Sequence, residues 1–72
     1  MSNKEFEKAR QALGAQLLKA RDKLRLTQQE VADASDMHVN YYARIERGQG
    51  NPSFEKLQNV MKVLKIKSLD LF

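Results

Sequence analysis

Residues 27–53, TQQEVADASDMHVNYYARIERGQGNPS, decide the fold of this chain. They predict two short helices joined by a tight turn, followed by a loop that contains glycine and by a new helix start. Thr27 suits the N-cap position of the first helix, and Glu30 three residues later completes a capping box. Gly48 is placed to end the second helix. Helices this short bury little surface alone. The angle between them instead allows the second helix to project from the rest of the domain.

The two expected helices span about residues 27–35 and 38–47. Val31 and Ala32 supply the inward face of the first, and Tyr42 and Ile45, three residues apart, supply that of the second. Asp36 lies in the turn between them, where aspartate tolerates the left-handed conformation.

Working outward, the apolar residues of 5–24 recur at spacings of three and four, which predicts a long first helix. Gly14 interrupts it at a cost of about 1 kcal/mol against alanine. This glycine either permits close packing or marks the end of an N-terminal extension, residues 1–13. A fourth helix is expected over 53–64 and a short fifth over 68–72. With no strand pattern, the whole chain, residues 1–72, is expected to be one all-α, five-helix domain.

These residues carry a family resemblance. The chain resembles the phage-repressor type (Cro/repressor-like, XRE) of helix-turn-helix transcriptional regulators in its Leu-Thr-Gln start, its Arg-Ile-Glu-Arg-Gly helix end and its Asn-Pro-Ser exit, residues 26–28, 44–48 and 51–53. The C-terminal stretch FEKLQNVMKVLKIKSLDLF is similar to the last two helices of such domains. Three positions depart from the usual pattern: Ser35, Asp36 and Tyr42 replace a leucine, a glycine and an Ile or Val. Restriction-modification controllers, phage repressors and antitoxins share this architecture.

The resemblance implies that the second helix of the motif reads duplex DNA in the major groove. Arg44 can pair with guanine and Asn40 with adenine, whereas apolar side chains can contact a thymine methyl. The alternative is that both are ordinary solvated helix residues. The base-reading positions are expected to be His38, Val39, Asn40, Ala43 and Arg44.

A second set of residues is expected at the DNA backbone, where contacts position the protein without specifying sequence. Gln28 lies in the first turn of its helix. The resemblance implies that it binds a DNA phosphate and braces the reading helix. Asn51 resembles a second phosphate contact, with a simple turn residue as the alternative. The full expected set is Thr27, Gln28, Tyr41, Arg47 and Asn51.

The resemblance also implies an ion pair between Arg21 and Glu46 beneath the motif. Arginine suits this position because its planar fork can hold a carboxylate at two points. The alternative is that Arg21 adds to the basic flank with Lys19, Lys23 and Arg25.

A homodimer on a palindromic site is expected, because one small reading helix offers little interface. The apolar residues Ile66, Leu69, Leu71 and Phe72 are the expected dimer surface. Two alternatives remain: the N-terminal helix, with Phe6 and Leu13, makes the dimer, or these residues only fill the core.

Composition limits the remaining function classes. The chain has 72 residues, no cysteine and one histidine, so neither disulfides nor cysteine-based metal sites can support it. Its net charge of +4 resides in the flanks, because residues 27–50 carry two basic and four acidic side chains. No catalytic set, cofactor site or apolar membrane segment is evident, so a cytoplasmic DNA-binding protein is expected. The competing hypothesis is a protein-interaction module of antitoxin or regulatory-partner type.

Overall fold

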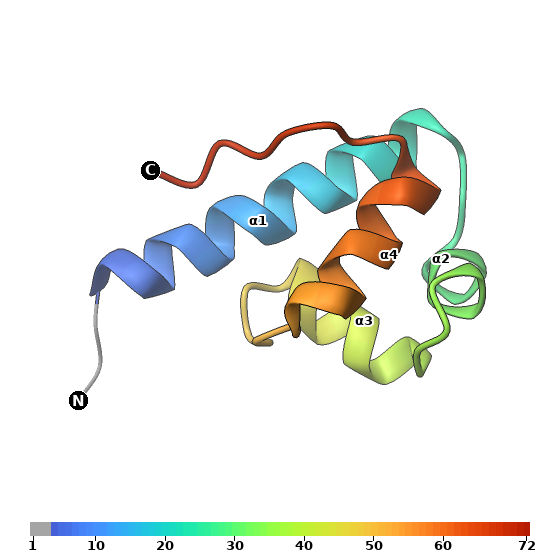
Figure 1. The fold of residues 1–72 in the computed structure, drawn as a ribbon, viewed down its shortest axis with the longest axis horizontal. Helices are drawn as coiled ribbons and strands as arrows, with labels where there is room; N and C mark the ends of the chain where they lie inside the picture. Colours follow the sequence, from blue (N-terminus) through green and yellow to red (C-terminus); the bar gives the residue numbers. More distant parts are fainter. Residues whose placement is uncertain (1–3) are drawn as a thin grey trace.

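The computed structural model describes residues 4–72, which form four helices and no strand. These are α1 (Lys4–Lys23), α2 (Gln28–Ala34), α3 (Val39–Glu46) and α4 (Phe54–Leu64) (Figure 1). Each bound lies within one residue of the bound expected from the sequence. The small differences arise because the capping residues Thr27, His38 and Ser53 precede their helices.

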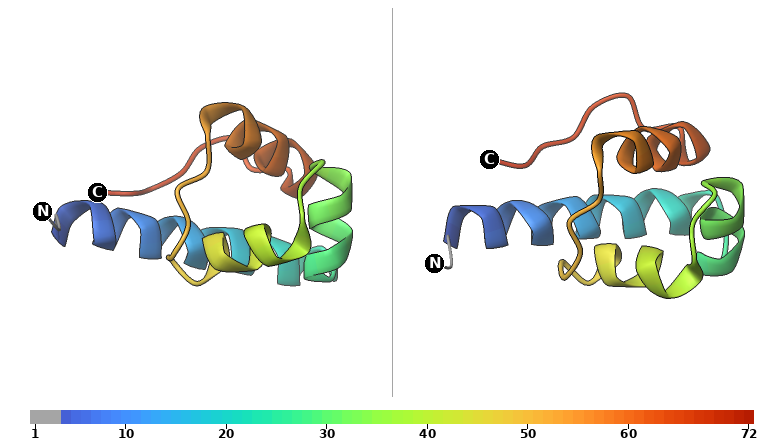
Figure 2. Two further views of the ribbon diagram at one scale, coloured as in Figure 1. Left: turned by 90° about the horizontal axis from the view of Figure 1, so that it is seen from below. Right: turned by 60° about the horizontal axis from the view of Figure 1, so that its bottom comes forward.

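The long helix α1 packs against α3, α4 and the C-terminal segment. The C-terminal segment, residues 66–72, runs back along one side of α1, and α3 lies on the opposite side (Figures 1 and 2). α4 packs on both α1 and α2. The protein therefore has a motif side, formed by α2 and α3, and a tail side, formed by the C-terminal segment.

The core is a single cluster to which every helix contributes. Its most buried large side chains, Leu17, Val31, Tyr42, Ile45 and Val60, are each at most 1% exposed. The inward positions predicted for the motif helices are therefore confirmed. Ser35, which replaces the leucine common in similar proteins, is also buried, and its hydroxyl has no hydrogen-bond partner.

Gly14 lies where α1 meets the end of α3. A Cβ atom built there would lie against the backbone oxygen of Glu46 and 2.6 Å from that of Ile45. Real Cβ atoms do not approach backbone this closely, so only glycine fits without displacing α3. The close packing considered for Gly14 is therefore observed, and α1 continues unbroken through it.

Helix ends in this chain place a residue in the left-handed region. Gly48 (φ 75°) does so after α3, where the amide of Gln49 donates to the carbonyl of Arg44 and so completes a Schellman motif. Asp36 adopts φ 57° after α2, as its turn position predicted. Arg25 and Lys65 adopt the same conformation after α1 and α4.

The expected fifth helix is wrong, because residues 66–72 are extended. Lys65 ends α4, and from Leu69 onward the side chains alternate between half-buried and exposed. So short a segment could form barely one helical turn, which is unfavourable without strong packing. Instead, the Gln16 side chain accepts from the amide of Asp70 at 2.9 Å and donates to its carbonyl at 2.6 Å.

Candidate nucleic-acid interface

The helices α2 and α3 each begin with an N-cap residue whose side chain accepts a hydrogen bond from a backbone amide. The Thr27 hydroxyl accepts from the amide of Glu30 at 3.0 Å, and the Glu30 carboxylate accepts from the amide of Thr27 at 2.8 Å. This is the predicted capping box. His38 caps α3, because its Nδ1 atom accepts from the amide of Asn40 at 3.1 Å. The start of each helix is thereby fixed by side chains next to it in sequence.

The outer face of α3 is polar and open. His38, Asn40 and Arg44 are exposed, and Val39 is half-buried. Ala43 was expected on this face, but it is only 8% exposed, so that placement is wrong. Its methyl group is short, and longer side chains lie one turn away at Val39 and Arg47, where they can shield it.

The residues expected at the DNA backbone differ in their exposure and in the contacts that they make within the protein. Thr27, Arg47 and Asn51 are exposed, although Arg47 donates to the Gln49 side chain at 3.2 Å. Tyr41 is half-buried and packs against the core. Gln28 is engaged within the protein, because its Nε2 atom donates to Glu46 Oε1 at 2.9 Å.

The ion pair expected between Arg21 and Glu46 is present. Arg21 donates from Nε to one carboxylate oxygen at 2.6 Å and from Nη2 to the other at 3.0 Å. Its Nη1 atom donates to the carbonyl of Leu26 at 3.0 Å. The Arg21 side chain is 14% exposed and that of Glu46 is 2% exposed, so the pair is largely desolvated.

Two further side chains complete this group. The hydroxyl of Tyr42 donates to Glu46 Oε2, and the amide of Gln28 donates to Oε1. We call Arg21, Gln28, Tyr42 and Glu46 the Glu46 network. The sequence-based interpretation placed Tyr42 in the core and did not foresee its bond to Glu46, although their spacing of four on one helix was a usable signal.

The network shifts the ionisation of its members. Burial alone raises the pKa of Glu46, but hydrogen bonds from Arg21, Tyr42 and Gln28 outweigh it, and the net pKa is lowered. Burial, followed by the hydrogen bond to Glu46, raises the pKa of Tyr42 far above its ordinary value. The hydrogen bond to Glu46 raises the pKa of Arg21 despite burial. The group is thus held as a carboxylate, a guanidinium and a neutral phenol.

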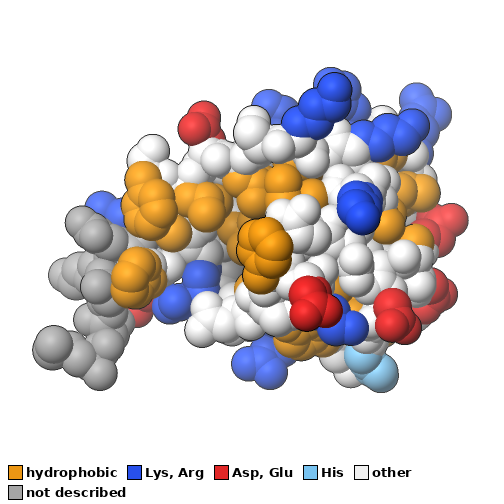
Figure 3. All heavy atoms as spheres, viewed as in Figure 1, with side chains coloured by type: hydrophobic (Ala, Val, Ile, Leu, Met, Phe, Trp, Pro, Cys, Tyr) orange, Lys and Arg blue, Asp and Glu red, His pale blue; other side chains and the backbone are white. Residues whose placement is uncertain are grey.

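The expected dimer residues divide into two kinds. Ile66, Leu69 and Leu71 are half-buried and pack against the core of their own chain. Phe72 is 90% exposed, and two more aromatic rings, Phe6 and Phe54, are 55% and 75% exposed. Figure 3 shows several hydrophobic groups on the face that contains the end of the chain.

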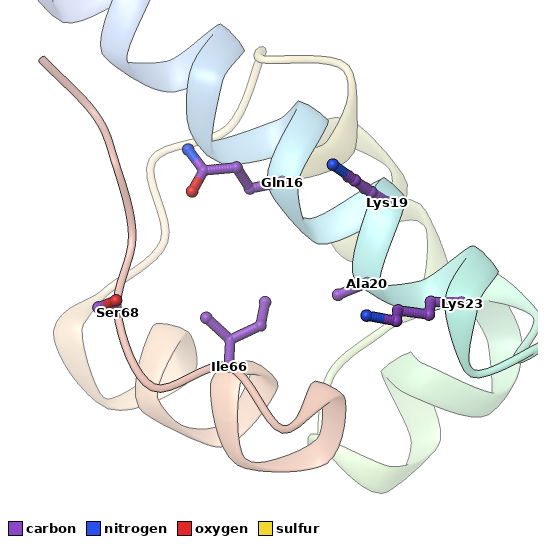
Figure 4. Close-up of a pocket in the computed structure, with 6 residues that line it drawn as sticks. All are labelled: Gln16, Lys19, Ala20, Lys23, Ile66 and Ser68. Atoms are coloured by element: carbon purple, nitrogen blue, oxygen red, sulfur yellow. The ribbon is translucent and has the colours of Figure 1, made fainter.

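An open groove of about 300 Å³ lies between α1 and the C-terminal segment. Figure 4 shows Ile66 and Ala20 on its facing walls, with the Lys23 amine extending between the two elements. Its lining residues are Gln16, Lys19, Ala20, Lys23, Ile66 and Ser68. The groove lies on the tail side and is therefore separated from α3 by α1.

Among residues 6–72, whose side chains the structure describes, no cluster of three His, Cys, Asp or Glu side chains is able to hold a metal ion. Within the same residues, no helix has the length and hydropathy needed to cross a membrane.

Comparison with known proteins gives one match. The family model described as helix-turn-helix matches residues 17–72, which include all of α2, α3 and α4 and the C-terminal segment. Comparison with curated proteins and with solved structures found no significant match. The match begins within α1, so residues 4–16 of that helix lie outside the matched region.

Proposed function

This chain belongs to the XRE-type helix-turn-helix family of DNA-binding regulators, and we propose that it binds specific sequences of double-stranded DNA as a homodimer with α3 in the major groove. The observation that carries the proposal is the polar outer face of α3. Asn40 and Arg44 lie one turn apart on it and are both exposed. Asparagine and arginine can each make two hydrogen bonds to a base edge, to adenine and guanine respectively.

The remaining contacts of this proposal position the protein on the DNA backbone. Thr27 and Gln28 lie at the start of α2, where free amides and the helix dipole favour a phosphate. Arg47 and Asn51 flank the far end of α3 and are exposed, and they are proposed to contact a second phosphate. His38 and Val39 are proposed to contact base edges, whereas Ala43 is buried and is not one of the proposed contacts.

The base-reading proposal is tested by selecting duplexes from a random pool with the purified protein and then measuring Arg44→Ala on the selected site. We expect Arg44→Ala to weaken that site by about 1–3 kcal/mol and to relax base choice at one position. Lys62→Ala is the matched control, because Lys62 is an exposed cation on α4, which is not part of the helix-turn-helix motif. An Arg44→Ala protein that binds the selected site as tightly as the parent would refute this reading face.

The dimer proposal centres on Phe72, because the other three expected residues pack within their own chain. Two copies would place two α3 helices on half-sites about one helical turn apart, which gives a palindromic operator. Sedimentation of wild type, Phe72→Glu and the control Phe54→Glu tests this. We expect only Phe72→Glu to dissociate the dimer. A wild-type monomer that binds DNA one chain per site would refute it.

A second candidate is a protein-interaction module, which the three exposed phenylalanine rings favour. If this candidate holds, the random-pool selection yields no enriched sequence and Arg44→Ala has no effect on the partner's binding. Selection of a defined palindrome favours the DNA-binding proposal instead.

A further inference from the structure

The carboxylate of Glu46 is held by donors from three helices. Arg21 from α1 bonds both oxygens, Gln28 from α2 bonds Oε1, and Tyr42 from α3 bonds Oε2. Because the Glu46 side chain is 2% exposed, water cannot readily replace any donor that is lost. A change in the direction of this carboxylate therefore changes the hydrogen bond that Gln28 makes with it.

Glu46 also decides which way the Gln28 amide faces. A glutamine amide has an oxygen that only accepts and a nitrogen that only donates, and the two ends can exchange by a flip. An ionised carboxylate only accepts, so it requires the nitrogen of Gln28 to face it. The nitrogen has two hydrogens, and the one not bonded to Glu46 remains available. A DNA phosphate likewise accepts only, so a flipped amide would present the wrong atom to it.

Tyr42 supplies the rigid reference in this arrangement. Its ring is fully buried, and it lies on α3 one turn before Glu46. Arg21 also bonds both oxygens, but it does so from another helix. The hydroxyl of Tyr42 fixes Oε2 and so turns Oε1 towards Gln28. An Ile or Val at position 42, as in similar proteins, would fill the core but could not donate.

We propose that Tyr42 is a positioning residue for DNA binding, which acts through Glu46 to hold the Gln28 amide with one N–H directed at a DNA phosphate. This inference rests on the proposed DNA-binding function. Under this proposal the buried Tyr42 raises the affinity for DNA, an effect that its packing in the core alone would not produce.

The test compares wild type, Tyr42→Phe, Gln28→Ala and the double variant. Each is measured on a fluorescent duplex of random sequence and on the duplex selected by wild type, at a temperature where circular dichroism shows every variant folded. We expect Tyr42→Phe to raise Kd on both duplexes by about threefold to tenfold, the value of one hydrogen bond. In the Gln28→Ala background the same change should leave Kd unaltered.

Val60→Ala is the control for a purely structural role, because Val60 is buried in α4 and is not part of the Glu46 network. It should lower the melting temperature without changing Kd. In the free protein, the side-chain amide resonances of Gln28 should move in Tyr42→Phe and stay in place in Val60→Ala.

The outcomes separate this inference from the function on which it rests. Wild type that binds neither duplex overturns both. Wild type that binds, with Kd unchanged in Tyr42→Phe, overturns the positioning role alone. An equal effect of Tyr42→Phe with and without Gln28 overturns the path through Gln28 and leaves a role in packing.

Discussion

The two sides of α1 are held together by different means. On the motif side, α3 touches α1 through backbone contact at Gly14 and through the buried Glu46 network. On the tail side, residues 66–72 are held by half-buried apolar side chains and by the two hydrogen bonds of Gln16. An open groove remains beneath the tail, whereas at Gly14 the end of α3 leaves no room for a methyl group.

The motif side therefore depends on the directions of its hydrogen bonds and backbone contacts, whereas the tail side depends on the apolar area that it buries. Hydrogen bonds and backbone contact fix the angle of α3, because their energy falls steeply with small displacements. Apolar contact on the tail side tolerates displacement, since burial has no direction. We therefore expect substitutions on the motif side to change both stability and DNA binding, and those on the tail side to change stability alone.

The largest effect is expected from separating Arg21 and Glu46. Arg21→Met and Glu46→Gln should each lower the free energy of unfolding by about 3–5 kcal/mol, because each leaves a buried charge or its partners uncompensated. Thermal or urea unfolding without DNA measures this. The double variant should lose much less than the sum of the two losses.

Additive losses of about 1 kcal/mol or less would mean that the pair behaves as an exposed one. If Arg21→Met then also lowers the salt dependence of DNA binding, Arg21 contacts a phosphate instead.

Gly14→Ala is expected to cause the next largest loss in the free energy of unfolding. The added methyl group must displace the end of α3, at a cost of about 1–3 kcal/mol, which exceeds the gain of about 1 kcal/mol in helix propensity. Chemical unfolding gives the net loss, and Kd for the selected duplex should rise because α3 moves. Ala15→Gly, at the exposed neighbouring position, calibrates the propensity term. A Gly14→Ala protein that is more stable than wild type would contradict the close contact.

Acid should weaken the motif side through Glu46. Its pKa is lowered in the folded protein, so its contribution is present above the ordinary carboxyl pKa of about 4.3 and is lost as pH falls through the folded value. Unfolding measured from neutral pH downward should therefore show a steeper loss in wild type than in Glu46→Gln. Equal slopes in the two proteins would show that other carboxylates carry the acid response.

The smallest effect is expected on the tail side. Gln16→Ala removes both hydrogen bonds to Asp70, which are exposed, and should cost about 1 kcal/mol or less. Hydrogen exchange at the Asp70 amide should become faster, while Kd for the selected duplex stays unchanged. A rise in Kd equal to that of Gly14→Ala would remove the distinction between the two sides.

Local features of the sequence determined the helices and their ends. The capping box at Thr27, the left-handed turn at Asp36 and the inward pair Tyr42 and Ile45 all depend on residues within four positions of one another, so a linear pattern predicts them. The Arg21–Glu46 pair joins distant positions, and it was expected only because the chain resembles a known family.

Tertiary structure decided what depends on distant neighbours. The tail is extended because Gln16 and the apolar side of α1 hold it, and no pattern within residues 66–72 records those partners. Ala43 was expected on the outer face of α3 and is buried instead. Gly14 could be read as a break or as a contact until α3 was placed against it. Arg21 and Gln28 reach Glu46 only after α1, α2 and α3 have packed together, because sequence spacing does not set the positions of side chains on different helices.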